Sequence, residues 1–466
     1  MSQPGRNKIF GTLLAAAMGF APLGAGAGAR QSDQAAKQSS GESSGESSGE
    51  SKITADVRTQ MVRFGGTEGS FCYATTDEPI QGHNIDKPVK IASVMKLLTT
   101  FWGVEALGAN SRFTTRVFIQ PESLEMHIEG SRDPYFDRRR LALLLADLNK
   151  LGFKSMNRIT ADVDFRIDYD ALTFQRDPSF AHDSSHAGTS LAAQNIKSKM
   201  EYGFNTAGWT KSDKQTYVRL SQQSGSPQLP NGVVFKVDDV DVVTSNPLKG
   251  KTGVVVFELK SAPLKMYLRE MNILSVNSLA DELFASLGGV AGFQTFIAAK
   301  FGTTFDVDQI YTGSGLPTNG VRHDTQVSCR TVVSLVRRMD KDLEAKGLGL
   351  EDVMMIAGKD VQDGATYQDN SQSLVVKTGT VDGAKNLAGV QETTAGEVYF
   401  GLFLQGRSAN SGNIMKVMTK FKQNFSSVRD SHAALVFDPV DSDMQLKQLI
   451  PSIPAESQPP VVMRKG

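Results

Sequence analysis

The spacing of apolar residues divides the chain into segments that predict strands and helices. A short apolar run at residues 70–76 predicts a strand. Residues 92–107 predict a buried helix, because apolar side chains such as Met95 and Leu98 recur at helical spacing before the stop at Gly108. The folded part of the chain therefore opens with a strand and a buried helix.

The pattern changes between residues 112 and 263. Short apolar runs typical of strands dominate there, with one helix at residues 139–151. The predicted strands cover residues 116–119, 124–128, 163–168, 232–243 and 254–259. We expect this region to be an inserted domain rich in β-strands.

Helices and a meander follow the insert. Helical patterns at residues 277–287 and 326–339 precede three strands, and the last helix is predicted at residues 413–425. The strands cover residues 373–381, 386–392 and 397–405. This order predicts an α+β fold, in which one antiparallel sheet with helices is closed by distant parts of the chain and interrupted by the β-rich insert.

The N-terminus has the pattern of an export signal. Arg6 and Lys8 precede an apolar run at residues 9–20, and small-x-small cleavage sites follow. The next segment repeats Ser, Gly and Glu and cannot bury a core, so it predicts a flexible linker. We expect an exported protein, periplasmic or secreted, with no stable membrane span after cleavage; an uncleaved anchor is the alternative.

These patterns together predict a main domain that is split in the sequence by the insert. The expected parts are a signal peptide at residues 1–29, a linker at 30–51, the main domain at 52–111 and 264–437, the inserted domain at 112–263 and a tail at 438–466.

Charge and composition narrow the possible partners. The 466 residues carry 50 Lys and Arg against 50 Asp and Glu, and this balance lacks the basic excess of a general nucleic-acid binder. Metal-protease, C-x-x-C and P-loop motifs are absent from the sequence, so we expect no metal and no cofactor. The two cysteines, Cys72 and Cys329, could pair after export, but the sequence equally allows two buried thiols.

The candidate chemistry begins with Ser93 and Lys96. They form the one S-x-x-K motif of the chain, at the start of the predicted buried helix, where positions i and i+3 share a face. A serine hydroxyl needs a base to become a nucleophile, and a lysine in an apolar site can have a pKa low enough to serve. The alternative is a helix-capping serine beside a lysine whose head reaches solvent.

Two further motifs follow. Ser275 and Asn277 form an S-x-N motif at the start of the helix at residues 277–287, and Lys377, Thr378, Gly379 and Thr380 form a K-T-G-T motif on the strand at residues 373–381. Other copies of these short patterns begin at Ser408, Ser411 and Lys251. Ser275 alone lies between Ser93 and a later K-T-G, which favours Ser275 and Lys377.

In this order the three motifs are the signature of penicillin-binding proteins and class A β-lactamases. The chain resembles the class C low-molecular-mass penicillin-binding proteins, the D-alanyl-D-alanine carboxypeptidases and endopeptidases of bacterial cell walls. Supporting matches are Met271-Asn272, Ala280-Asp281-Glu282-Leu283 and Gly313-Ser314-Gly315-Leu316. The resemblance covers about residues 52–437.

The resemblance implies an acyl-enzyme mechanism. Ser93 would attack the D-Ala-D-Ala carbonyl, Lys96 would accept its proton, and Ser275 would relay that proton to the leaving amine. Asn277 would hold the substrate amide, and Lys377 and Thr378 would position a carboxylate. The backbone N–H groups of Ser93 and Thr380, the latter following Gly379, would form the oxyanion hole. The implied partners are peptidoglycan stem peptides and β-lactam inhibitors.

The chain departs from the family at three places. The insert is shorter than the two added domains that the family usually has. The Gly-Ser-Gly-Leu loop begins with Thr312 where the family has Asp, and Thr318 stands where the family has an arginine that recognises diaminopimelate, with Arg322 close by. Asp168 resembles the acidic position that contacts the amino end of diaminopimelate. An acid without its partner base predicts a permissive enzyme.

Two other classes of protein are alternatives to a peptidase. A class A β-lactamase also needs a glutamate in an E-x-x-N pattern, which this chain lacks. A catalytically silent wall-binding protein would predict loss of a catalytic position, and all of them are present. The sequence leaves the balance between carboxypeptidase and endopeptidase action open.

Overall fold

The structure is a computed structural model that describes most of residues 51–449. The residues outside the description within that range are 135, 137, 166, 168–189, 212, 216–217, 219–233, 303–304, 306, 308, 318–322, 361–370, 429–434 and 436–443, together with the side chains of 138, 139 and 190–195. Asp168, Thr318 and Arg322 therefore lie outside the described residues.

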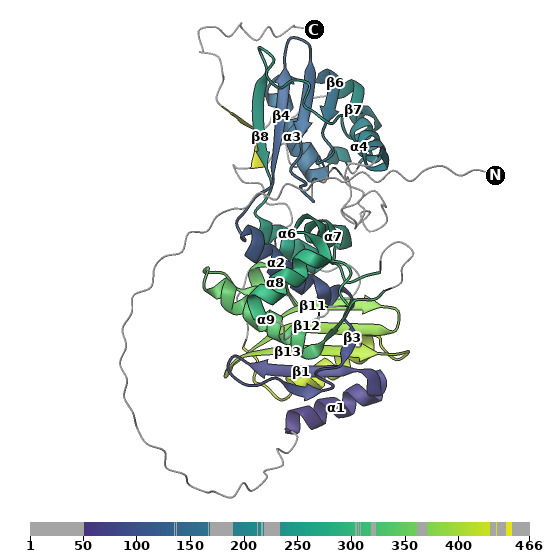
Figure 1. The fold of residues 1–466 in the computed structure, drawn as a ribbon, viewed down its shortest axis with the longest axis vertical. Coiled ribbons are helices and arrows are strands. Elements are labelled where there is room, and N and C mark those ends of the chain that lie inside the picture. Colours follow the sequence, from purple (N-terminus) through teal and green to yellow (C-terminus); the bar gives the residue numbers. More distant parts are fainter. Residues whose placement is uncertain are drawn as a thin grey trace, which may run out of the picture. The chain divides into compact units, whose positions relative to one another are not determined.

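A six-stranded antiparallel sheet combines strands from before and after the insert (Figure 1). Its strand order is β10, β11, β12, β13, β1 and β2. The strands are β1 (Ser70–Thr75), β2 (Gln81–His83), β10 (Met355–Ile356), β11 (Leu374–Val381), β12 (Ala384–Thr393) and β13 (Gly396–Gln405). Ser70 of β1 pairs with Phe403 of β13, so the sheet is closed by distant segments, as the sequence predicts.

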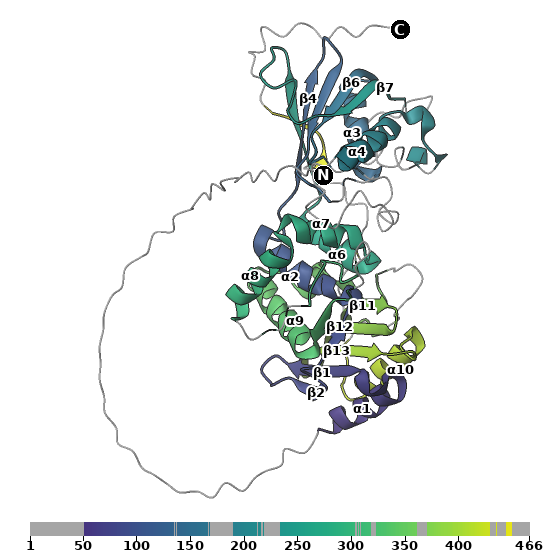
Figure 2. The same ribbon diagram turned by 45° about the vertical axis from the view of Figure 1, so that its right-hand side comes forward.

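Both faces of this sheet are buried, and side chains alternate between them. In β1, Phe71 and Tyr73 belong to one apolar cluster, whereas Cys72 and Ala74 belong to the other. Helices α1 (Lys52–Gly65) and α10 (Ser411–Lys422) cover the face of Phe71 (Figure 2). Residues 71–74 of the predicted strand are therefore buried whichever face their side chains lie on.

The opposite face is covered by a layer of helices. They are α2 (Met95–Leu107), α6 (Leu264–Leu274), α7 (Asn277–Ser286), α8 (Gly289–Phe301) and α9 (Cys329–Glu344). Trp102 of α2 packs edge-on against Phe284 of α7 and Phe293 of α8, with ring centroids 5.3 and 5.5 Å apart. Helix α2 is thus the buried helix that the sequence predicts.

No single helix in the described part of the chain is long and apolar enough to cross a membrane. Helices α7 and α8 reach the required length and composition only as a pair, and the pair is bent by 73° at its junction.

Two predicted helices begin differently from the expectation. Residues 92–94 form the 3₁₀ turn η2 (Ala92–Val94), and α2 starts only at Met95. In the second case, β9 (Gln326–Ser328) pairs with β3 (Pro88–Lys90), and α9 starts at Cys329 because the Ser328 hydroxyl accepts the Thr331 N–H at 3.2 Å. The β3–β9 ladder leads the chain directly into η2.

A second six-stranded sheet is formed largely by the residues between α2 and α6. Its order is β14, β8, β4, β5, β6 and β7, and the pairs β5–β6 and β6–β7 are parallel. The strands are β4 (Thr114–Gln120), β5 (Glu125–Glu129), β6 (Ser155–Ala161), β7 (Lys236–Val242), β8 (Val255–Lys260) and β14 (Lys447–Gln448). The segment expected as a tail therefore contributes one strand.

Helices accompany the parallel strands, since a parallel connection needs a crossover. Helix α3 (Arg138–Lys150) matches the predicted helix at residues 139–151, whereas α4 (Ser190–Gly203) was not predicted. Short 3₁₀ turns complete the described elements: η1 (Gly66–Glu68), η5 (Thr206–Gly208) and η6 (Leu350–Asp352).

The predicted strand at residues 163–168 is wrong for its described residues. Strand β6 ends at Ala161, and the carboxylate of Asp162 then accepts the N–H groups of Asp164 and Phe165 at 3.1 and 2.9 Å. A carboxylate that binds the backbone N–H groups just ahead of it forms a turn, which competes with strand pairing. Apolar residues here pack beside the sheet without extending it.

The second sheet region contacts the helix layer through a salt bridge. Arg132, which follows β5, donates to Glu282 of α7 from Nε at 3.0 Å and from Nη2 at 2.7 Å. Glu282 is buried, so this charge depends on its partner. The contact fixes the insert to the helix that begins at Asn277.

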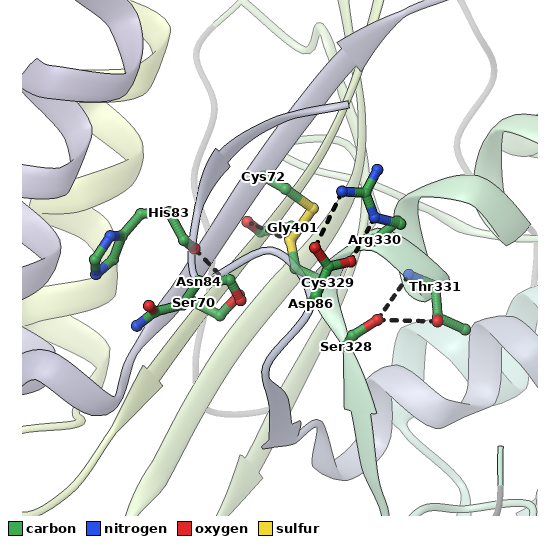
Figure 3. The surroundings of a disulfide bond; sticks show 10 residues. All are labelled: Ser70, Cys72, His83, Asn84, Asp86, Ser328, Cys329, Arg330, Thr331 and Gly401. Carbon is green, nitrogen blue, oxygen red and sulfur yellow. Dashed lines mark hydrogen bonds and ion pairs between the residues drawn. A yellow bond between two sulfur atoms is a disulfide. The ribbon is translucent and has the colours of Figure 1, made fainter. Parts of the chain in front are cut away.

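The two cysteines form a disulfide between β1 and the first residue of α9 (Figure 3). Cys72 and Cys329 are 257 residues apart in the sequence, and their Cα atoms are 5.9 Å apart. Both side chains are buried. The bond ties the start of α9, and with it the β3–β9 ladder, to the antiparallel sheet that contains β1, here called the central sheet.

The disulfide should contribute measurably to stability, because it closes a long loop in the unfolded chain. We expect Cys72→Ser/Cys329→Ser to lower the free energy of unfolding by about 2–4 kcal/mol, measured by urea denaturation. The wild-type protein unfolded with a thiol reductant is the matched control. Equal unfolding midpoints for oxidised wild type and the double variant would show that the bond does not stabilise the fold.

Candidate active site

Ser93 lies in a tightly enclosed turn between a strand and a loop. It belongs to η2, and the residue before it, Ala92, has a left-handed φ of 48°. A Cβ at Gly379 of β11 would lie 2.5 Å from the carbonyl oxygen of Ile91, and one at Gly315 would lie 2.1 Å from that of Ala92. Glycine at both positions lets β11 and the loop approach the turn, which leaves Ser93 7% exposed.

Lys96 is fully buried one helical turn after Ser93. Its Nζ donates to Ser93 Oγ at 2.9 Å, to Asn277 Oδ1 at 2.7 Å and to the Ser314 carbonyl oxygen at 3.4 Å. These acceptors account for all three protons of an ammonium group. Burial disfavours that charged form and lowers the pKa of Lys96 to about 7. The alternative of a lysine reaching solvent is therefore excluded.

Asp281 limits how far the pKa of Lys96 falls. Its negative charge favours the ammonium form of Lys96 and raises that pKa against the larger effect of burial. Asp281 Oδ1 also accepts the N–H of Ser314 at 2.7 Å, which fixes the loop whose carbonyl group faces Lys96. The carboxylate thus positions one partner of Lys96 and acts on its charge.

Ser275 stands at the junction of two helices. It follows the last residue of α6 with a left-handed φ of 57°, and its N–H caps that helix on the carbonyl oxygen of Met271. A serine in this conformation is uncommon and strained. Asn277 then begins α7. Both residues of the S-x-N motif therefore lie where the chain turns from α6 into α7.

Lys377 of β11 is the hydrogen-bond partner of Ser275. Its buried Nζ donates to Ser275 Oγ at 3.1 Å and to the Thr378 carbonyl oxygen at 2.9 Å. Burial, with repulsion from Lys96 and Lys385, holds the pKa of Lys377 well below its usual value. The remaining residues of the motif follow along β11, with Thr378 half-buried and Thr380 exposed.

The structure thus brings Ser93, Lys96, Ser275, Asn277 and Lys377 into hydrogen-bonded pairs, with Thr378, Gly379 and Thr380 on the adjoining strand. Asp168, the remaining predicted site residue, lies outside the described residues. Sequence reasoning assigned no role to Asp281, to the Ser314 carbonyl group or to Lys385. Asp281 and Ser314 belong to segments that support the family resemblance, whereas Lys385 belongs to no motif.

The competing motif copies have structural explanations. Lys251 lies near the second sheet, where its Nζ is 3.7 Å from a carboxylate oxygen of Glu125. Asn410 caps α10 by accepting the N–H of Asn413 at 2.9 Å. Within the described part of the chain, no group of three or more His, Cys, Asp or Glu side chains could hold a metal ion.

The fold and the arrangement of the three motifs define a serine peptidase of the low-molecular-mass penicillin-binding class. The chain belongs to the D-Ala-D-Ala carboxypeptidase 3 (S13) family, whose profile matches residues 57–178 and 231–425. The predictions of the family, of the α+β fold and of a serine DD-peptidase are therefore confirmed.

Solved structures show the same relationship. The predatory endopeptidase Bd0816 of Bdellovibrio bacteriovorus, in complex with the immunity protein Bd3460, is 27% identical; the alignment covers 81% of this chain and 99% of that one, with a TM-score of 0.70. The penicillin G-acylated endopeptidase Bd3459 of the same organism, also with Bd3460, is 26% identical, with coverage of 82% and 99% and a TM-score of 0.67.

Penicillin-binding protein 4 (dacB) of Haemophilus influenzae shares the fold at 17% identity, with coverage of 80% and 98% and a TM-score of 0.51. No curated protein sequence matches the chain.

We expect Lys96 to lose its proton near pH 7, because its ammonium group is fully buried. Asp281→Asn should lower this pKa further, since the carboxylate favours the charged form. ¹³C NMR of protein labelled at lysine Cε measures the titration, and Lys96→Met identifies the signal by its loss. A Lys96 signal that titrates near the ordinary value of about 10.4 would contradict the prediction.

Proposed function

We propose that this protein is an exported serine DD-peptidase of bacterial peptidoglycan that works through an acyl-enzyme on Ser93. It would cleave terminal D-Ala-D-Ala and cross-links between D-Ala and diaminopimelate. The observation that carries the proposal is the 2.9 Å hydrogen bond between Lys96 Nζ and Ser93 Oγ, made by a lysine whose pKa is lowered to about 7. A buried amine with this pKa is a general base suited to neutral pH.

Acylation begins when neutral Lys96 takes the proton of Ser93. Ser93 Oγ then bonds to the carbonyl carbon of the D-Ala residue, and the carbonyl oxygen becomes an oxyanion. The backbone N–H groups of Ser93 and Thr380 would bind that oxyanion, since β11 and η2 approach each other at Gly379. Asn277, which accepts from Lys96, would hold the substrate amide.

The acyl-enzyme forms when the C–N bond breaks and the leaving amine receives the proton. Ser275 lies within hydrogen-bond distance of Lys377 and would relay this proton. Lys377 and Thr378 would position the carboxylate of the leaving residue. Water then hydrolyses the ester and returns the proton to the Ser93 hydroxyl.

Two observations support export. Disulfides persist mainly in oxidising compartments outside the cytosol, and Cys72 and Cys329 form one. A relative of the same fold at 27% identity, Bd3459, is a peptidoglycan endopeptidase, and that substrate lies outside the cytoplasmic membrane. The signal peptide at residues 1–29 remains a prediction.

We expect benzylpenicillin to acylate the protein once, on Ser93, because a β-lactam mimics the D-Ala-D-Ala end. The rate should rise as pH increases through about 7, since Lys96 accepts a proton only when neutral. Lys96→Met should slow acylation by about 10²- to 10⁴-fold. Intact-mass spectrometry with peptide mapping measures the adduct.

Lys251→Met is the matched control, because it removes the lysine of the other K-T-G copy, and it should acylate at the wild-type rate. An adduct on another residue, or a Lys96→Met protein that acylates normally, would contradict the mechanism. Rapid hydrolysis of the adduct would instead indicate the serine β-lactamase alternative.

Purified sacculi distinguish the two peptidase activities. We expect digestion to release terminal D-Ala from pentapeptides and to convert cross-linked dimers to monomers, with products separated by liquid chromatography. Ser93→Ala should produce neither change. Trimmed pentapeptides with intact dimers would refute the endopeptidase half of the proposal.

A further inference from the structure

A third lysine lies beside the two that the motifs identify. Lys385 is the second residue of β12 and pairs with Thr380 of β11. Paired residues of an antiparallel ladder present their side chains to the same face, and Lys385 Nζ donates to Thr380 Oγ1 at 2.7 Å. The ammonium group therefore lies next to the residue whose backbone N–H would bind the oxyanion.

No carboxylate neutralises Lys385 among the described residues. Its one hydrogen bond goes to a neutral hydroxyl, and burial lowers its pKa without an opposing charge. Lys90, which precedes η2 by two residues, differs in this respect, because its Nζ is 2.6 Å from Asp324. Burying half of a cation without a counter-charge costs free energy. The hydrogen bond to Thr380 does not explain this cost, because water could also satisfy the exposed Thr380 hydroxyl.

Basic side chains outnumber the carboxylates that act on them at this site. Lys96 and Lys385 both repel the charged form of Lys377, whereas Asp281 is the carboxylate that acts on Lys96. Basic groups gathered in one place attract anionic ligands and strengthen their hydrogen bonds. The three protons of a Lys96 ammonium group all have acceptors in the protein, and Lys377 has two acceptors. Lys385 has one, so two of its donors are available beside the exposed Thr380.

We infer that Lys385 is a specificity-determining residue that binds a carboxylate group of the substrate. The inference rests on the proposed peptidase function and adds a cation to the carboxylate position expected at Lys377 and Thr378. Two carboxylates of a peptidoglycan peptide have the required chemistry. One is the α-carboxylate of the leaving residue, and the other belongs to the diaminopimelate side chain of the peptide that acylates the enzyme.

Two synthetic peptides distinguish these sources. The first is L-Lys-D-Ala-D-Ala with both lysine amines acetylated, so its one carboxylate is the terminal one. The second has diaminopimelate in place of lysine and therefore carries an additional carboxylate. The variants are Lys385→Met, which removes the charge, and Lys385→Arg, which keeps it; Lys251→Met is the control for net charge.

We expect Lys385→Met to lower kcat/KM by about 10- to 100-fold for each peptide whose carboxylate Lys385 binds in the wild-type protein. This fold-change corresponds to the loss of one charge-assisted hydrogen bond. Lys385→Arg should recover most of this loss, and Lys251→Met should match wild type. An equal loss on both peptides assigns the terminal carboxylate, and a loss confined to the second assigns the diaminopimelate carboxylate.

The inference is overturned if Lys385→Met cleaves both peptides at the wild-type rate. It is also overturned if Lys385→Arg fails to recover a loss, since a positive charge at this position would then not be the cause. Urea denaturation of each variant shows whether the fold is retained. Wild-type protein that cleaves neither peptide would contradict the proposed function instead.

Discussion

The burial of one lysine ammonium is the constraint on which the site depends. Lys96 has no exposed surface, so each of its protons needs an acceptor within the protein. The acceptors are Ser93, Asn277 and the Ser314 carbonyl group, which come from three distant parts of the sequence. The same burial that lowers the pKa of Lys96 thus forces η2, α7 and the Gly-Ser-Gly loop into one arrangement.

The surrounding fold supplies the rigidity that this arrangement needs. The turn that holds Ser93 follows directly from the β3–β9 ladder, and the disulfide ties the residue after β9 to the central sheet. On the other side, β11 packs against the turn through Gly379. Ala92 and Ser275 can keep strained left-handed conformations because the sheet, the helix layer and the loop surround them.

Sequence patterns predicted those parts that repeat locally. The strands of the meander, the buried helix and the motifs of Ser93, Ser275 and Lys377 were all visible, because apolar spacing and short motifs are properties of adjacent residues. The pairing of Cys72 with Cys329 was not, since it depends on which strands become neighbours. Lys385 was missed for the same reason: its position beside Thr380 follows from strand register, which no single-segment pattern encodes. The strand expected at 163–168 does not form in its described residues, because the Asp162 carboxylate accepts the backbone N–H groups of Asp164 and Phe165.

The pairing of β1 with β13 also dictates when the molecule can become complete during its synthesis. Ser70 needs Phe403 as its ladder partner, and the chain between them contains the whole insert and the whole helix layer. Early segments must wait for late ones, because non-local contacts form only after the intervening loop has closed. A nascent chain that ends before the meander has Ser93 and Lys96 but lacks Lys377 and the strand that encloses them. Ser93 and Lys96 therefore lack the rest of the site until β11 has been made.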